Sequence, residues 1–129
     1  MNLKPEIITS RSNPIVKWVA SLHEKKGREE SRSFIVEGEK LSLEAIKAGL
    51  PVTHIFIRED RVEKILPHIC EAVKLQKNSK VSVFSLSEGA FSKISTEKSP
   101  QGVISVIKYL DFFFNIDIIY KKDFFVLPN

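Results

Sequence analysis

The sequence predicts an α/β fold, a three-layer sandwich in which helices cover both faces of a largely parallel four-stranded sheet. From residue 33 to 107, short apolar runs rich in β-branched residues alternate with segments whose apolar residues recur at helical spacing. A largely parallel sheet is expected to be buried on both faces. This alternation is typical of a sheet with helices on both sides.

One additional helix is expected before this alternation, from residue 13 to 26. Ser12 or Asn13 can cap it, and Pro14 suits its first turn, where the missing N–H costs nothing. Apolar residues then follow at helical spacing, namely Ile15, Val19 and Leu22. Gly27 is expected to end the helix.

Seven further elements are expected along the alternation. The strands are the apolar runs at 33–37, 52–57, 81–86 and 103–107, and the helices between them are 39–48, 62–73 and 87–94. Gly49 should end the first of these helices, and Ser87 should cap the last. Pro67 lies inside the second, so that helix either kinks there or consists of two short helices.

Length and composition limit the possible classes of protein. The 129 residues are 43% hydrophobic, which suits one compact domain with a buried core. No apolar run is long enough for a membrane span, and the first ten residues have no signal-peptide core, so a cytoplasmic protein is expected. The net charge of +4 and pI of about 9.2 permit phosphate binding without demonstrating it.

Common catalytic and cofactor patterns are absent from the sequence. The five glycines are scattered, with no Gly-rich phosphate loop and no G-x-S-x-G elbow. His23, His54 and His68 lie far apart, and Cys70 alone cannot assemble a thiolate metal site. We therefore expect no self-contained active site, no cofactor site and no metal site in this chain.

A basic and polar segment near the N-terminus is the candidate binding region. Arginine can hold phosphate in a bidentate fork, lysine acts as a mobile point charge, and asparagine or serine can bond to sugar or phosphate oxygens. Trp18 could stack on a base, although packing in the core is preferred. The basic residues could equally form an ordinary solvated helix face. The segment contains Arg11, Ser12, Asn13, Lys17, Lys25, Lys26, Arg28 and Arg32.

Three short segments occur in an informative order. Residues 8–17 contain Ser-Arg-Ser-Asn-Pro-Ile-Val-Lys, Arg28 follows the first helix, and the next strand ends in Glu37-Gly38. Residues 99–104 read Ser-Pro-Gln-Gly-Val-Ile before the last strand. In this order, and on these elements, the segments resemble the SpoU/TrmH family of RNA ribose 2′-O-methyltransferases, which has "S-x-x-N-P-x-[IV]-K", "E-G" and "P-Q-G-[IV]" segments. The resemblance covers residues 7 to about 108.

The resemblance implies a substrate-binding domain similar to RNA-binding ribosomal-protein domains, which holds a structured ribosomal or transfer RNA. It implies four parts, namely a basic arm and helix (1–32), the RNA-binding domain (33–108), a linker (109–123) and the first strand of a missing catalytic domain (124–129). In the family that catalytic domain binds S-adenosylmethionine and usually dimerises. The resemblance therefore implies that the cofactor site and homodimer interface lie outside this chain, which should be inactive alone.

The candidate RNA-binding residues combine the basic segment with the family's E-G position. Those expected to hold phosphates and sugars are Arg11, Asn13, Lys17, Arg28 and Arg32. Glu37 and Gly38 would shape the adjacent surface, or Glu37 would instead accept backbone N–H bonds at the start of the following helix. Two other interpretations stay open, a free-standing RNA-binding protein similar to a ribosomal protein and a protein-docking module that uses residues 112–114.

Overall fold

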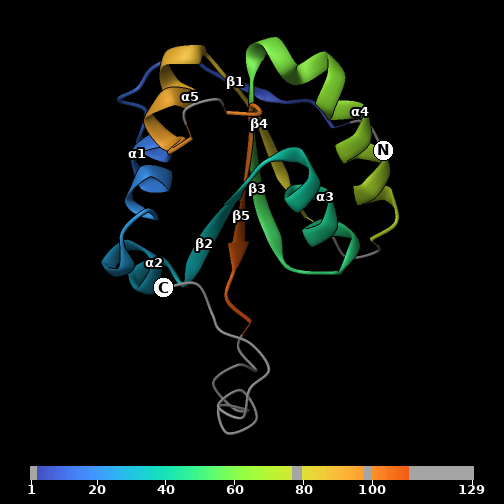
Figure 1. Ribbon diagram of the computed structural model, residues 1–129, viewed down its shortest axis with the longest axis horizontal. Coiled ribbons are helices and arrows are strands. Elements are labelled where there is room, and N and C mark those ends of the chain that lie inside the picture. The colour runs from blue at the N-terminus through green and yellow to red at the C-terminus, as the bar shows by residue number, and fades with distance from the viewer. Residues whose placement is uncertain (1–2, 77–79, 98–99, 111–129) are drawn as a thin grey trace, which may run out of the picture.

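The computed structural model describes residues 3–76, 80–97 and 100–110. Helices and strands alternate from residue 33 onward as the sequence predicts (Figure 1). The elements in chain order are β1 (Glu6–Ile8), α1 (Pro14–Ser21), α2 (Lys25–Ser31), β2 (Ser33–Glu37), α3 (Glu39–Lys47), β3 (Val52–Arg58), the short 3₁₀ helix η1 (Glu59–Arg61), α4 (Val62–Lys74), β4 (Ser82–Leu86), α5 (Glu88–Ile94) and β5 (Val103–Lys108).

The strands form one mixed sheet in the order β1-β4-β3-β5-β2. β4 pairs in parallel with β1 and β3, whereas β5 pairs antiparallel with β3 and β2. The prediction of a four-stranded, largely parallel sheet was therefore wrong in strand number and in the direction of β5. α5 has seven residues, so it is about 10 Å long. After this short helix the chain is still at the edge of the sheet where β4 ends, and β5 runs back from that edge.

The fifth strand, β1, escaped prediction because its sequence signal is weak. It has three residues, and only Ile8 among them is buried. Ile7 is 75% exposed, so no run of buried residues marks the strand. Its pairing with β4 comes from the tertiary structure alone. Residues 6–31 consequently pack in one unit with the strands and helices that follow.

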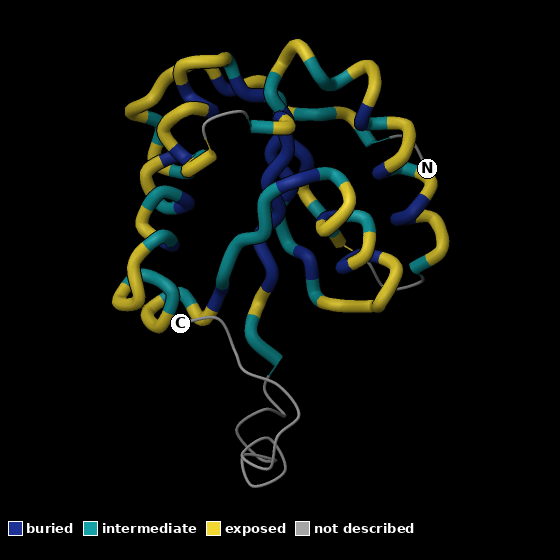
Figure 2. Tube along the Cα trace, in the orientation of Figure 1, coloured by how far each residue is buried: buried dark blue, intermediate teal, exposed yellow. Residues whose placement is uncertain are grey.

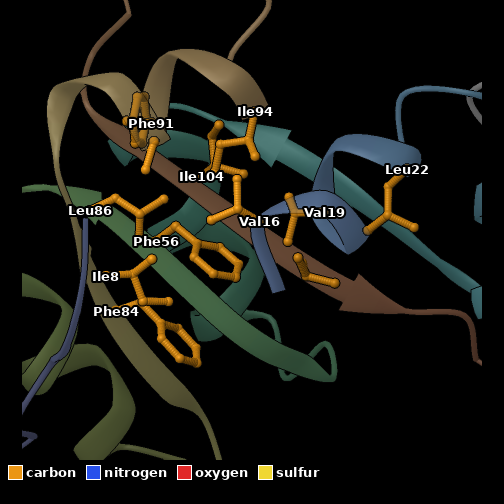
Figure 3. Close-up of a cluster of buried hydrophobic side chains, with 12 residues drawn as sticks. Ile8, Val16, Val19, Leu22, Phe56, Phe84, Leu86, Phe91, Ile94 and Ile104 are labelled. Atoms are coloured by element: carbon orange, nitrogen blue, oxygen red, sulfur yellow. The ribbon is translucent and has the colours of Figure 1, made fainter. Parts of the chain in front are cut away.

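Helices cover both faces of the sheet, and this part of the predicted sandwich is confirmed. α1 and α5 pack on one face and α3 and α4 on the other (Figure 1). Successive residues of β3 alternate between the two cores, with Phe56 facing α1 and α5 (Figure 3) and Ile55 and Ile57 facing α3 and α4. Each such buried side chain contributes about 1.5–3 kcal/mol. Figure 2 shows the buried residues along the central strands.

The predicted helix at 13–26 is two helices, α1 and α2, with a break between Ser21 and Lys25. Gly27 lies inside α2 and does not end a helix. A Cβ atom at Gly27 would collide with the carbonyl oxygen of Ser21. The glycine therefore permits the close approach of α2 to the end of α1.

The other helix boundaries agree with the sequence. Asn13 Oδ1 accepts a hydrogen bond from the Ile15 N–H at 2.8 Å, and Ser87 Oγ accepts one from the Ala90 N–H at 3.1 Å. Gly49, with φ of +79°, follows the end of α3. Pro67 lies within a single continuous helix, α4, which decides between the two alternatives that the sequence left open.

The predicted strand at 124–127 and the aromatic residues 112–114 lie outside the described residues. Across the three described ranges, no helix is long and apolar enough to cross a membrane. The same ranges contain no group of three or more His, Cys, Asp or Glu side chains that could hold a metal ion.

Candidate nucleic-acid interface

Strands β1 to β4 all run in one direction and end at the same edge of the sheet, where the antiparallel strand β5 begins. We call this the carboxyl-end edge, and we define it by the connections 9–13, 38–39, 58–61, 87–89 and 101–102. Ligands of open α/β sheets bind outside the carboxyl ends of the strands. The opposite side, where β1 to β4 begin, is called the amino-end edge.

The two family-like segments E-G and P-Q-G meet at the carboxyl-end edge. Gly38 has φ of +108°, and its N–H donates to the Val103 carbonyl at 2.9 Å. Gln101 Oε1 accepts a hydrogen bond from the Glu39 N–H at 3.1 Å, although these residues lie 62 positions apart. That bond satisfies a backbone N–H in the first turn of α3. The segments thus form one structural unit, which joins the end of β2 to the start of β5.

Glu37 accepts three hydrogen bonds from the connection that follows α5. Its donors are Ser95 Oγ at 3.0 Å, the Thr96 N–H at 2.9 Å and Thr96 Oγ1 at 2.9 Å. The suggestion that Glu37 accepts N–H bonds at the start of the following helix was wrong, because Gln101 takes that position. The carboxylate instead fixes the connection from α5 to β5 at the carboxyl-end edge.

The N-terminal segment contributes Arg11 and Asn13 to the same edge. Asn13 is committed to capping α1, and its N–H donates to the Ser10 carbonyl at 3.2 Å. The exposed Arg11 donates through Nη1 to the Gly89 carbonyl at 3.5 Å and to Ser92 Oγ at 3.4 Å. Both bonds are at the long limit, so Arg11 can turn toward a phosphate. Lys17 is exposed one turn farther along α1.

Arg28 and Arg32 lie toward the other end of the sheet, because α2 sits beside the start of β2 (Figure 1). Arg28 Nη1 donates to the carbonyls of Leu22 at 3.1 Å and His23 at 3.0 Å, so it caps the end of α1. Arg32 ends α2 with φ of +51°, directly before β2. The length of β2, about 15 Å, separates these two arginines from the carboxyl-end edge. The structure does not bring them together with Arg11.

Two arginines that the sequence analysis did not single out lie at the carboxyl-end edge. Arg58 forms a bidentate ion pair with Asp60, with Nε–Oδ1 at 2.6 Å and Nη2–Oδ2 at 3.3 Å. This pairing raises the pKa of Arg58 and lowers the pKa of Asp60. Arg61 follows in η1 and is half-buried. The available signal was their position directly after an apolar strand, where a parallel sheet gathers its ligand-binding residues.

Trp18 is used for packing, as preferred from the sequence. Its Nε1–H donates to Ser31 Oγ at 2.8 Å, which links α1 to α2. Its ring lies 4.9 Å from the ring of His54, which also stacks on Phe56 at 6.1 Å. Burial lowers the pKa of His54, so this side chain is neutral at pH 7.

An open groove at the amino-end edge lies between the C-terminal ends of α3 and α4, and its lining does not fit S-adenosylmethionine. Its lining has no carboxylate that could pair with ribose hydroxyls or with a sulfonium charge, and it consists of Ile46, Gly49, Leu50, Pro51, Val52, Thr53, Leu75, Gln76, Lys80 and Val81.

The fold and the convergence of the two segments define a substrate-binding α/β domain, and comparison with known families agrees. A family described as "MRM3-like substrate binding domain" matches residues 13–105, and the chain belongs to this family. The resemblance to the N-terminal substrate-binding domain of SpoU/TrmH RNA ribose methyltransferases is thereby confirmed.

The chain is also similar to individual methyltransferases. The chain is 32% identical over 99 residues to the 23S rRNA (guanosine(2553)-2′-O)-methyltransferase RlmP of Bacillus subtilis, covering 77% of this chain and 36% of that protein. A crystal structure of an rRNA methyltransferase from Sinorhizobium meliloti matches with TM-score 0.63 and 28% identity, over 81% of this chain and 37% of that one. An RNA 2′-O ribose methyltransferase matches with TM-score 0.64 and 26% identity, over 81% and 38%. The chain therefore spans little more than a third of these relatives.

Proposed function

We propose that this substrate-binding domain serves a ribose 2′-O-methyltransferase that acts on ribosomal RNA, and that it holds the RNA at its carboxyl-end edge. The names of the relatives, RlmP and the Sinorhizobium meliloti enzyme, support ribosomal RNA. One observation carries the placement of the interface. Arg11 lies in the connection after β1, Arg58 and Arg61 lie at the end of β3 and in the connection after it, and both connections are at one edge.

The proposed mechanism is positioning. Arginine binds phosphate through charge-assisted hydrogen bonds, and such contacts orient RNA without reading its sequence. The exposed hydroxyls of Ser10 and Ser12 lie in the same connection as Arg11 and can bond to ribose hydroxyls. The net charge of +4 adds a general attraction for RNA. Together these groups would bring a ribose 2′-hydroxyl to the methyl donor.

Methyl transfer itself would take place in another part of the whole protein, the part that corresponds to the rest of the relatives' length. S-adenosylmethionine supplies the methyl group in such enzymes, and a structure of the Sinorhizobium meliloti relative contains it. The catalytic residues and a homodimer interface would belong to the same part, and the enzyme would work in the cytoplasm. This chain alone should bind RNA and leave it unmethylated.

The test is a binding titration of the 129-residue chain with labelled fragments of ribosomal RNA and with bulk transfer RNA. We expect a dissociation constant on the order of 10⁻⁴ to 10⁻⁶ M at physiological salt. Log affinity should fall linearly with log salt concentration between about 50 and 200 mM. Failure to bind any RNA, even at low salt, would overturn the proposed function. Preference for transfer RNA would overturn the choice of ribosomal RNA alone.

A further inference from the structure

We propose that Arg61 is the principal phosphate-binding residue of the carboxyl-end edge, and that Gly102 lacks a side chain so that Arg61 can lie across the P-Q-G turn. The ligand is a phosphodiester group of the bound RNA. This inference therefore rests on the proposed function and names one contact within it.

Arg58 is the least available of the three arginines at this edge. Its guanidinium forms two bonds to the Asp60 carboxylate and lies 5.9 Å from the centre of the Phe91 ring. The Arg58 side chain is only 19% exposed. A phosphate would have to displace Asp60 and would gain little net charge attraction, because the pair is already neutral.

Arg11 is accessible to a phosphate, but only long hydrogen bonds hold its side chain in place. Its side chain is exposed, and its two acceptors are neutral oxygens at 3.4 and 3.5 Å. Ordering an exposed arginine on binding costs conformational entropy. We therefore assign Arg11 a peripheral contact.

Arg61 combines a fixed position with a guanidinium that forms no ion pair among the described residues. Its Nε atom is buried and has no hydrogen-bond partner among the described residues. Asp60 attracts Arg61 over a longer distance, but the two Asp60 oxygens are held by Arg58. Because the buried Nε is closed to an incoming phosphate, the phosphate would bind the two terminal nitrogens of the half-buried guanidinium.

Gly102 explains how Arg61 reaches its position. A Cβ atom at Gly102 would lie 2.6 Å from Arg61 Cγ and 3.3 Å from Arg61 Cβ, so the arginine stem rests directly on the backbone of the turn. The turn itself is fixed, because the Gly102 carbonyl accepts a hydrogen bond from the Arg58 N–H at 2.8 Å. Arg61 is thus half-buried and pre-positioned, which lowers the entropy lost on binding.

The experiment measures the salt dependence of binding between the full 129-residue chain and a labelled RNA hairpin. We expect Arg61→Gln to lower affinity about tenfold at low salt and to reduce the slope of log affinity against log salt by about one. Arg61→Lys should keep the slope and lose affinity, because lysine cannot offer the bidentate fork. Lys26→Gln removes the same charge from an exposed site in α2 and should change both quantities less.

The outcomes separate this inference from the proposed function. If the unmodified chain binds the hairpin with strong salt dependence and Arg61→Gln changes neither affinity nor slope, the assignment of Arg61 is overturned while the function stands. If the unmodified chain does not bind RNA, the proposed function fails first. Thermal unfolding of each variant shows whether the fold is retained, and Arg61→Lys preserves the test if Arg61→Gln does not fold.

Discussion

The two edges of the sheet use arginine in different ways. At the amino-end edge, Arg28 donates to two backbone carbonyls at the end of α1, so its charge completes the local structure. At the carboxyl-end edge, Arg61 rests on a glycine turn, and its Nε atom finds no acceptor among the described residues. Both residues contribute equally to net charge. The contacts that an arginine makes with the backbone around it, more than the amino-acid composition, therefore show whether it serves the structure or can bind a ligand.

The largest effect is expected from Gly102→Ala at the carboxyl-end edge. Gly102 has φ of +91°, which an alanine adopts only with strain, and the new Cβ would press on Arg61. We expect a loss of about 3 kcal/mol in unfolding free energy, measured by urea denaturation. In an Arg61→Ala background the loss should be smaller, because the contact with Arg61 is absent.

Gly89→Ala is the matched control. Gly89 lies in α5, and an added Cβ would meet only the Arg11 side chain at 3.9 Å or beyond. Alanine is favoured over glycine inside a helix by roughly 0.5–1 kcal/mol, so this variant should be as stable as the original or more so. Equal losses for the two alanine variants would contradict the special role of Gly102.

Glu37→Ala should cause the next largest loss. It removes the acceptor for Ser95 and for both the N–H and the hydroxyl of Thr96. We expect a loss of about 1–2 kcal/mol in unfolding free energy, and faster amide hydrogen exchange at Thr96. Glu30→Ala, at an exposed position in α2, provides the comparison. Unchanged exchange at Thr96 would show that Glu37 does not fix this connection.

Arg28→Ala sharpens the comparison from the amino-end edge. It should cost about 1 kcal/mol of stability, because two carbonyls at the end of α1 lose their donor. We also expect Arg28→Ala to change the slope of log RNA affinity against log salt no more than Lys26→Gln does. A slope reduced by as much as in Arg61→Gln would restore Arg28 to the RNA interface.

His54 should give the smallest effect, a pH dependence of stability. Burial lowers the pKa of His54 in the folded chain below its usual value of about 6.5. The unfolded chain therefore binds the proton first, and stability is full above about pH 6.5 and falls on acidification toward the folded pKa. His54→Phe should flatten this fall in urea denaturation. Subtracting the two profiles isolates the contribution of His54.

Much of the fold was predictable because local signals and packing agree. The caps at Asn13 and Ser87 and the glycine at Gly49 mark helix ends through backbone chemistry that the sequence shows directly. β1 was missed because three residues are too few to show the alternation of apolar and polar residues that marks a strand. β5 pairs antiparallel with β2 and β3, which lie far from it in sequence, so no local pattern could give its direction.

The candidate site was predictable only in part. The E-G and P-Q-G segments were recognised, but their contact through Gln101 and Glu39 exists only in the folded chain. Arg28 and Arg32 were grouped with Arg11 because they are near in sequence, whereas the length of β2 separates them in space. Arg61 was overlooked because its short polar connection reads as a solvated turn until Gly102 is placed beneath it.

The most direct test of the RNA interface is to map amide chemical shifts of the 129-residue chain during titration with an RNA hairpin. Binding at the carboxyl-end edge predicts the largest shifts at residues 10–13, 58–61 and 101–102, with small changes in α2. The largest shifts at residues 25–32, with those three connections unchanged, would contradict the account and place the RNA at the opposite end of the sheet.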